Sequence, residues 1–193
     1  MTGRWPAWPF AVGAALLSLA VLRRAGPGRR WSYGSRAPGV ASESAGGGQL
    51  DRDPSKLAPA FADNLEKLFQ RLRAQGFDPM LNEGYRSPER GDRLKSLGYS
   101  QAGARSMHVW GAAADLISAS GGWSDSEAMW QAMGPIAEDL GMIWGGRWNF
   151  YDPAHVQGVE VNEQKRLRGL PIDDGHEFVA GSLARRTKGV ILV

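Results

Sequence analysis

The chain has no cysteine and only three histidines among its 193 residues. The lack of cysteine excludes disulfide bonds, cysteine-rich zinc fingers and a thiol nucleophile. Any metal site must therefore use His, Asp or Glu as ligands, and three histidines leave few combinations. The sequence also has no internal repeat, and its length suits one domain with appendages.

Acidic residues are scarce at the start of the chain. The first 50 residues carry six arginines and one glutamate, whereas residues 51–193 carry 17 basic and 19 acidic residues. The net charge of +3 therefore arises from the N-terminal segment, and the main body is close to neutral. A near-neutral body argues against a nucleic-acid-binding domain, so we expect no nucleic-acid partner.

The apolar run at residues 10–22 is preceded by one arginine and followed by two. Thirteen residues suit the core of a signal peptide better than a full membrane span, so residues 1–24 are predicted to be a signal peptide or an N-terminal membrane anchor. A loose hydrophobic tail is the alternative, and the two arginines after the run do not favour export, because positive residues tend to stay in the cytoplasm. Residues 25–52 are rich in Gly, Ser, Ala, Pro and Arg, which predicts a flexible linker.

The folded domain is predicted to cover residues 53–160, and residues 161–193 form a C-terminal extension of unclear role. Apolar residues at helical spacing predict a first helix at residues 57–72, with Gly76 as its stop. A short strand is predicted at residues 80–85.

Capping residues predict two more helices. Ser87, followed by a proline in the first turn, opens a helix that should end by Gly98. Ser124 and Glu127 have the spacing of a capping box and open a helix that ends near Leu140, with a kink possible at its Gly-Pro pair. The other predicted elements are a polar loop at residues 99–107, a buried strand at 109–117, a short strand at 142–144, a loop at 145–153 and a weak helix at 162–168.

Few strands and helices of unequal length predict an α+β domain, in which a small antiparallel sheet is flanked by helices. Within this domain, His108, Asp115 and His155 form a set of the kind that binds catalytic zinc, which commonly has three protein ligands and one open position. The seven residues from His108 to Asp115 would span about 20 Å or more if extended, so the chain must turn between them, and Gly111 offers a hinge. Spacing alone leaves open a structural histidine and an aspartate that caps a turn.

Four segments, taken together, resemble a family of zinc peptidases. They are Ser-x-His-x-x-Gly-x-Ala-x-Asp at residues 106–115, Asp-x-x-His at 152–155, GYRSPER at 84–90 and LGMIWGGRW at 140–148. This family includes D-alanyl-D-alanine carboxypeptidases, dipeptidases and phage L-alanyl-D-glutamate endolysins. The resemblance covers residues 55–158 and implies a Hedgehog/D-Ala-D-Ala-peptidase-like fold with one zinc ion per chain.

The resemblance also implies roles for individual residues. His108, Asp115 and His155 correspond to the zinc ligands, Asp152 to the general base, and Arg86 to the arginine near the substrate carbonyl or carboxylate. A carboxylate beside a zinc-bound water can take its proton, and a guanidinium can stabilise the negative charge that develops. Taken without the resemblance, Asp152 would be a turn residue before a proline, and Arg86 would pair with one of two nearby glutamates.

Two further residues are candidates for substrate binding. Arg147 stands where the endolysin-like pattern has an aspartate, so a basic residue at the cleft rim could favour an acidic stem peptide. Gln157 could line the site. The third histidine, His176, lies outside the matched region and is predicted to be part of a solvated turn.

The WGG and DPAH segments favour an L-alanyl-D-glutamate endopeptidase that acts on peptidoglycan stem peptides. The alternatives are a D,D-carboxypeptidase or dipeptidase that releases D-Ala, and a non-catalytic wall-binding module. We expect a monomer in the cell envelope, periplasmic or extracellular, with a membrane tether if the N-terminal segment is an anchor.

Overall fold

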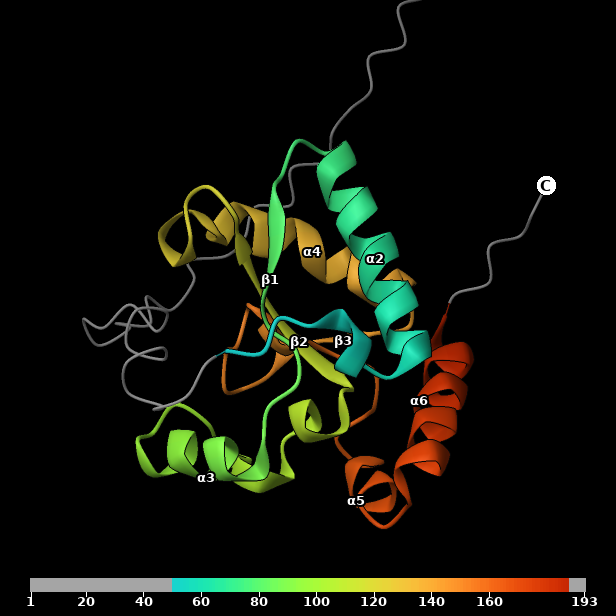
Figure 1. Cartoon of the computed structure of the whole chain (residues 1–193). Coiled ribbons are helices and arrows are strands. Elements are labelled where there is room, and N and C mark those ends of the chain that lie inside the picture. The colour runs from blue at the N-terminus through green and yellow to red at the C-terminus, as the bar shows by residue number, and fades with distance from the viewer. Residues whose placement is uncertain (1–49, 188–193) are drawn as a thin grey trace, which may run out of the picture. The chain divides into compact units, whose positions relative to one another are not determined.

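A computed structural model of the chain describes residues 50–187. The predicted signal peptide or anchor at residues 1–24 and nearly all of the predicted linker at 25–52 lie outside the described residues. Helices α2 and α4 pack on a small antiparallel sheet, and α6 packs beside α2 (Figure 1). The predicted α+β class, with a small antiparallel sheet and flanking helices, is confirmed.

The sheet has four strands in the order β1-β2-β4-β3, and each neighbouring pair is antiparallel. Its register is irregular at one point, between Leu81 and Glu83 of the edge strand β1. The strands are β1 (Pro79–Glu83), β2 (Ala113–Ser118), β3 (Ile143–Trp144) and β4 (His155–Gln157).

Side-chain alternation along β2 and β4 places Asp115 and His155 on the same face of the sheet. Ala114, Leu116 and Val156 are fully buried in the hydrophobic core. Asp115 stands between Ala114 and Leu116 and pairs in register with His155 of β4. Because successive side chains of a strand point to opposite faces, Asp115 and His155 project together from the other face.

Helix α2 (Pro59–Ala74) forms where the apolar spacing predicts it, and it buries Phe61, Leu65, Leu68 and Leu72. Each such side chain contributes up to about 1.5–3 kcal/mol when removed from water, far more than an exposed ion pair. The helix stops before Gly76, whose φ of +86° suits glycine. Helix α3 (Pro88–Ser96) is also confirmed, with the Ser87 hydroxyl accepting a hydrogen bond from the Arg90 amide.

The predicted start of helix α4 is wrong by two residues, because the N-cap position is held by Ser126 and not by Ser124. Ser124 lies in a 3₁₀ turn at Trp123–Asp125, and α4 covers Glu127–Asp139 with Ser126 as its N-cap. The Ser126 hydroxyl donates to the Gly122 carbonyl and accepts from the Ser118 amide, so it ties the turn to β2 and does not cap the helix. Local spacing could not reveal this long-range partner.

The predicted strand at residues 109–117 is only partly correct, because residues Met107–Trp110 form a 3₁₀ helix and β2 starts at Ala113. At the other end of the chain, α5 (Gln164–Leu167) agrees with the predicted weak helix. Helix α6 (Ile172–Arg186) was not predicted from the sequence. His176 lies in this helix and not in a turn.

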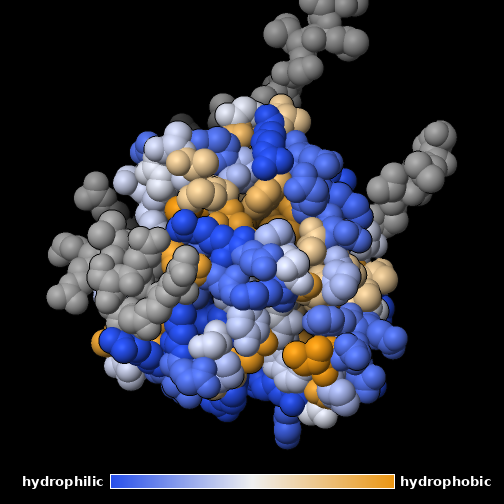
Figure 2. Space-filling view, in the orientation of Figure 1, coloured by the Kyte–Doolittle hydropathy of each residue, from blue (hydrophilic) through white to orange (hydrophobic). Residues whose placement is uncertain are grey.

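The surface seen in Figure 2 is mainly hydrophilic, with smaller apolar areas between the polar ones. Among the described residues, the large hydrophobic side chains that are exposed are Leu97, Phe150, Val161 and Ile172. No helix within residues 50–187 is long and apolar enough to cross a membrane. The apolar run at residues 10–22 lies outside this range.

Candidate metal centre

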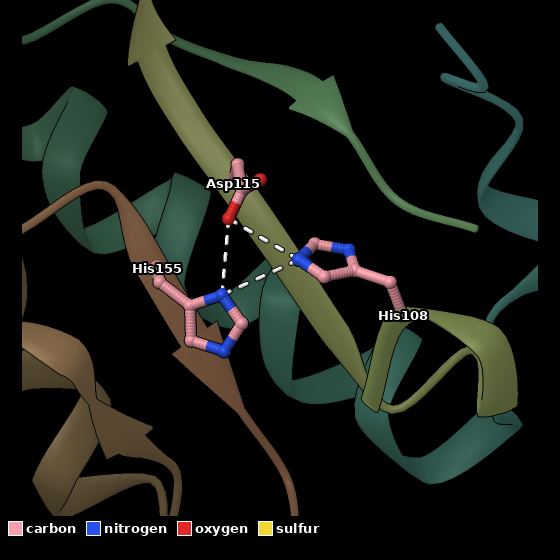
Figure 3. A group of neighbouring side chains, drawn as sticks. All are labelled: His108, Asp115 and His155. Carbon is pink, nitrogen blue, oxygen red and sulfur yellow. Dashed lines mark hydrogen bonds and ion pairs between the residues drawn. The ribbon is translucent and has the colours of Figure 1, made fainter. Parts of the chain in front are cut away.

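His108, Asp115 and His155 point toward one another from three different segments (Figure 3). His108 lies in the 3₁₀ helix before β2, Asp115 in β2 and His155 at the start of β4. The Asp115 Oδ1 atom is 3.0 Å from His155 Nδ1 and 3.3 Å from His108 Nε2, and the two ring nitrogens are 3.3 Å apart. The predicted turn between His108 and Asp115 forms at Gly111, which has a φ of +60°, and it brings the two side chains together.

These separations fit a tetrahedral zinc ion. Ligand atoms about 2.0–2.1 Å from such an ion lie about 3.3 Å from one another. The three measured separations, 3.0, 3.3 and 3.3 Å, are close to that value. Two imidazole nitrogens and one carboxylate oxygen also form a donor set that zinc accepts in catalytic sites.

The hydrogen bond on the far side of His108 determines which of its nitrogens faces the cluster. His108 Nδ1 lies 2.7 Å from the carbonyl oxygen of Gly84. A carbonyl oxygen can only accept, so Nδ1 carries the proton and Nε2 presents a lone pair. Burial lowers the pKa of His108, and the charge of Arg86 lowers it further, which favours the neutral form that binds metals.

His155 is oriented in the same way by Gln157. The Gln157 side-chain amide donates to the Val159 carbonyl, so its Oε1 atom faces His155 Nε2 at 3.2 Å. His155 Nε2 must then donate, and Nδ1 presents its lone pair to the cluster. Gln157 was predicted to line the site. The structure places it behind His155, fully buried, where it fixes the ring of a candidate ligand.

Three acceptor atoms thus face one another at about van der Waals distance, which is unfavourable unless a cation lies between them. Burial opposes the ionisation of Asp115, but the adjacent rings of His108 and His155 and the charge of Arg86 hold the pKa of Asp115 well below its usual value. For His155, burial lowers the pKa, but the carboxylates of Asp115 and Asp152 raise it overall. Charges that favour a proton here would equally favour a metal ion.

Asp152 lies in the loop between β3 and β4, beside this cluster. Its backbone carbonyl accepts from the His155 amide, so Asp152 is a turn residue, as its place before a proline suggests. Burial and the charge of Asp115 raise the pKa of Asp152 to about 6, although His155 and Arg86 oppose the shift. Among residues 50–187 its carboxylate has no hydrogen-bond partner, so it is available as a base.

Arg86 contacts the carboxylate of Asp115 from the side opposite the imidazoles. Its Nη2 atom donates to Asp115 Oδ2 at 3.0 Å and to Glu83 Oε2 at 2.6 Å. The expected pairing with Glu83 is therefore present, and the contact with Asp115 comes in addition. From the sequence, Glu83 was expected only as a possible partner of Arg86, and no contribution to the metal centre was predicted for it, although it stands directly before the GYRSPER segment.

Arg147 and Trp148 lie at different distances from the cluster. Arg147 is exposed and forms a two-point ion pair with Glu138 of α4, with distances of 2.8 and 3.2 Å. Among the described residues it contacts none of the three candidate ligands, and its role toward substrate stays a prediction. Trp148 is half-buried, and its ring centroid lies 5.1 Å from that of His155. It forms part of the wall beside the cluster.

Replacing Gly111 by alanine is expected to destabilise the protein by roughly 3 kcal/mol or more. A left-handed residue other than glycine costs about 1–2 kcal/mol, and a Cβ at this position would also collide with the backbone of Lys56 and Leu57. Urea unfolding measures the loss. Gly76→Ala is the matched control, because φ is also positive there but no atom lies within 4 Å of the added Cβ. Equal losses in the two variants would show that the close packing at Gly111 is unimportant.

Comparison with known proteins gives matches over part of the chain. Residues 100–158 match the model of a family described as D-alanyl-D-alanine carboxypeptidase. The chain is 29% identical over 126 residues to the peptidoglycan L-alanyl-D-glutamate endopeptidase CwlK of Bacillus subtilis (strain 168), an alignment that covers 55% of this chain and 75% of that protein.

Similar solved structures include VanYB in complex with D-alanine-D-alanine (TM-score 0.44, 19% identity, 65% of this chain and 86% of that one). Another is the LdcB LD-carboxypeptidase (TM-score 0.39, 25% identity, 62% of this chain and 67% of that one). The family match spans all three candidate ligands and Asp152. Over this segment, the chain resembles the D-alanyl-D-alanine carboxypeptidase family of peptidases.

Proposed function

We propose that the chain is a zinc peptidase that hydrolyses the stem peptides of peptidoglycan, and that it cuts the bond between L-alanine and D-glutamate. The observation that carries this proposal is the three-ligand cluster, with the carboxylate of Asp152 beside it and without a hydrogen-bond partner in the described residues. The similarity to the endopeptidase CwlK supports the choice of bond.

His108, Asp115 and His155 would hold one zinc ion through two nitrogens and one oxygen. When bound, zinc would supply a Lewis acid and lower the pKa of a water molecule toward about 7. The three protein ligands would leave the fourth position of a tetrahedral site open.

Asp152 would then act as the general base. Its raised pKa, about 6, is near the range in which a carboxylate both accepts a proton from water and returns it to the leaving amine. The buried guanidinium of Arg86 is close enough to lower the pKa of Asp152 and would stabilise negative charge on the substrate in the same way. Trp148 would form one wall for the substrate.

Digestion of purified peptidoglycan by the zinc-loaded protein tests the proposal. New amino groups are labelled, the products are hydrolysed, and the labelled amino acids are identified. We expect labelled D-glutamate to increase with time and no free D-Ala to appear. An Asp152→Asn sample processed in parallel corrects for background hydrolysis.

The same digest separates the alternatives. Release of D-Ala without labelled D-glutamate would identify a D,D-carboxypeptidase, which the description of the matching family model favours. Stoichiometric zinc without any hydrolysis would identify a wall-binding module. Either outcome would contradict the proposed endopeptidase.

We also propose that the protein works in the cell envelope, because its proposed substrate lies outside the cytoplasmic membrane. The apolar run at residues 10–22 would direct it there as a signal peptide or an anchor. Fractionation of cells that express the tagged full-length chain tests this, and recovery only from the cytoplasm would contradict it.

A further inference from the structure

Two carboxylates lie opposite each other in the sheet at the edge of the metal centre. Glu83 of β1 pairs in register with Asp115 of β2, which in turn pairs with His155 of β4. Glu83 is only 3% exposed. Like charges directly opposite on neighbouring strands repel each other, so this pairing requires a cation between them.

Arg86 supplies that cation. Its Nη2 atom bridges Glu83 Oε2 at 2.6 Å and Asp115 Oδ2 at 3.0 Å. The other oxygen of Glu83, Oε1, accepts from Arg90 Nε at 2.7 Å. Asp115, Arg86, Glu83 and Arg90 thus form a line of four alternating charges, here called the charge ladder, and three of the four are less than 9% exposed.

Local sequence explains how both arginines reach Glu83. The chain leaves β1 at Glu83 and turns through Gly84, and Ser87 then caps helix α3. This turn returns Arg86 to the end of the strand, and the first turn of α3 brings Arg90 next to it. Buried ion pairs contribute little net stability because their desolvation is costly. Stability alone therefore does not explain why the charge ladder is buried.

The ladder ends on the candidate metal ligand, and this gives it a role. Arg86 occupies Asp115 Oδ2 and leaves Oδ1 facing the two imidazoles at 3.0 and 3.3 Å. Because Arg86 also pairs with Glu83, its positive charge is divided between Glu83 and Asp115. Without Glu83, two guanidinium groups would lie beside the single carboxylate of Asp115, and one excess positive charge would remain near the position of the metal ion.

We propose that Glu83 is a positioning residue of the metal centre: acting through Arg86, it fixes Asp115 in its ligand geometry and keeps that carboxylate negative enough to bind the ion. The inference rests on the proposed zinc site. It adds a residue that touches neither the ion nor the substrate. Partners of this kind typically change metal affinity by 10- to 100-fold when they are replaced.

Glu83→Gln tests the role, because glutamine has the same shape and lacks the charge. Zinc affinity is measured by competition with a chelator on the full chain, and urea unfolding of the metal-free protein is measured beside it. We expect the zinc Kd to rise by 10- to 100-fold. A Kd equal to that of the wild type in the folded variant would overturn the inference, even if stability falls.

Glu163→Gln is the matched control. Glu163 also binds two arginines, Arg185 and Arg186, but it lies at the N-cap of α5 and contacts α6. Its replacement should lower stability without changing the zinc Kd. An equal rise of the Kd in both variants would show that the effect comes from loosening of the fold, and would also overturn the inference.

Three further measurements complete the test, and the first two cover a Glu83→Gln chain that unfolds without metal. The zinc concentration at which the variant folds then reports its affinity, because only the folded state holds the site. Glu83→Asp keeps the charge but is one methylene shorter, so an intermediate Kd is expected. In an Arg86→Gln background, Glu83→Gln should have little further effect on the Kd, whereas additive effects would show that Glu83 does not act through Arg86.

Failure of this inference and failure of the proposed function give different results. A wild-type protein that binds no zinc would overturn the proposed function. A wild-type protein that binds zinc, with an unchanged Kd in Glu83→Gln, would overturn the role of Glu83 alone.

Discussion

Replacing Asp152 by asparagine is expected to lower kcat/KM on peptidoglycan by about 10²- to 10⁴-fold while zinc stays bound. Asparagine has nearly the same shape but cannot take a proton from water. The Asp152 carboxylate has no hydrogen-bond partner within residues 50–187, so its replacement should not disturb the packing around it. The three candidate ligands do not depend on it for their orientation.

Two measurements on the same samples test whether Asp152 is the base: the initial rate of stem-peptide cleavage and the bound zinc per chain. Asp174→Asn is the control, because Asp174 is exposed in the first turn of α6, and its rate should equal that of the wild type. If Asp152→Asn loses its zinc together with its activity, Asp152 acts as a ligand or a structural residue and not as the base.

Replacing His155 by alanine is expected to abolish both stoichiometric zinc binding and hydrolysis. Two of the three protein ligands would remain, too few for a catalytic zinc site. The loss should also appear in stability. If zinc binds the folded wild type at 1,000 times its Kd, it stabilises the fold by about 4 kcal/mol. In His155→Ala, the unfolding midpoint should be the same with and without zinc.

His176→Ala is the control for this experiment, since His176 is the one histidine outside the cluster and lies in α6. It should keep one zinc ion, full activity and the zinc-dependent rise in unfolding midpoint. Zinc binding by His155→Ala with the affinity of the wild type would contradict the proposed ligand set. Chelation of the wild type should reproduce the loss of activity, and added zinc should restore it.

Much of the fold could be predicted from the sequence because it depends on neighbours along the chain. The apolar spacing in α2 and the Ser87 cap of α3 are local signals, and both helices form where they predict. The need for a turn between His108 and Asp115 followed from chain geometry alone, and Gly111 makes that turn. The motif resemblance then supported His155 as the third member of this set.

Other features depend on partners that are distant in the sequence. The Ser126 hydroxyl bonds to β2 and Gly122 and does not form a capping box, and α6 is stabilised by packing of Val179 and Leu183 near Phe61 of α2. A weakly amphipathic segment such as α6 gains its helical structure mainly from such contacts. The sequence of α6 alone therefore gives only a weak signal for a helix.

The metal centre shows the same division between sequence and tertiary structure. The sequence by itself determined which residue types could bind a metal, since it offers no cysteine and only three histidines. Only the tertiary structure decided which nitrogen of each ring faces the cluster, through Gly84 and Gln157. It also decided that Glu83 stands opposite Asp115, because strand register is set by pairing across the sheet and by side-chain burial, neither of which can be read from one strand alone.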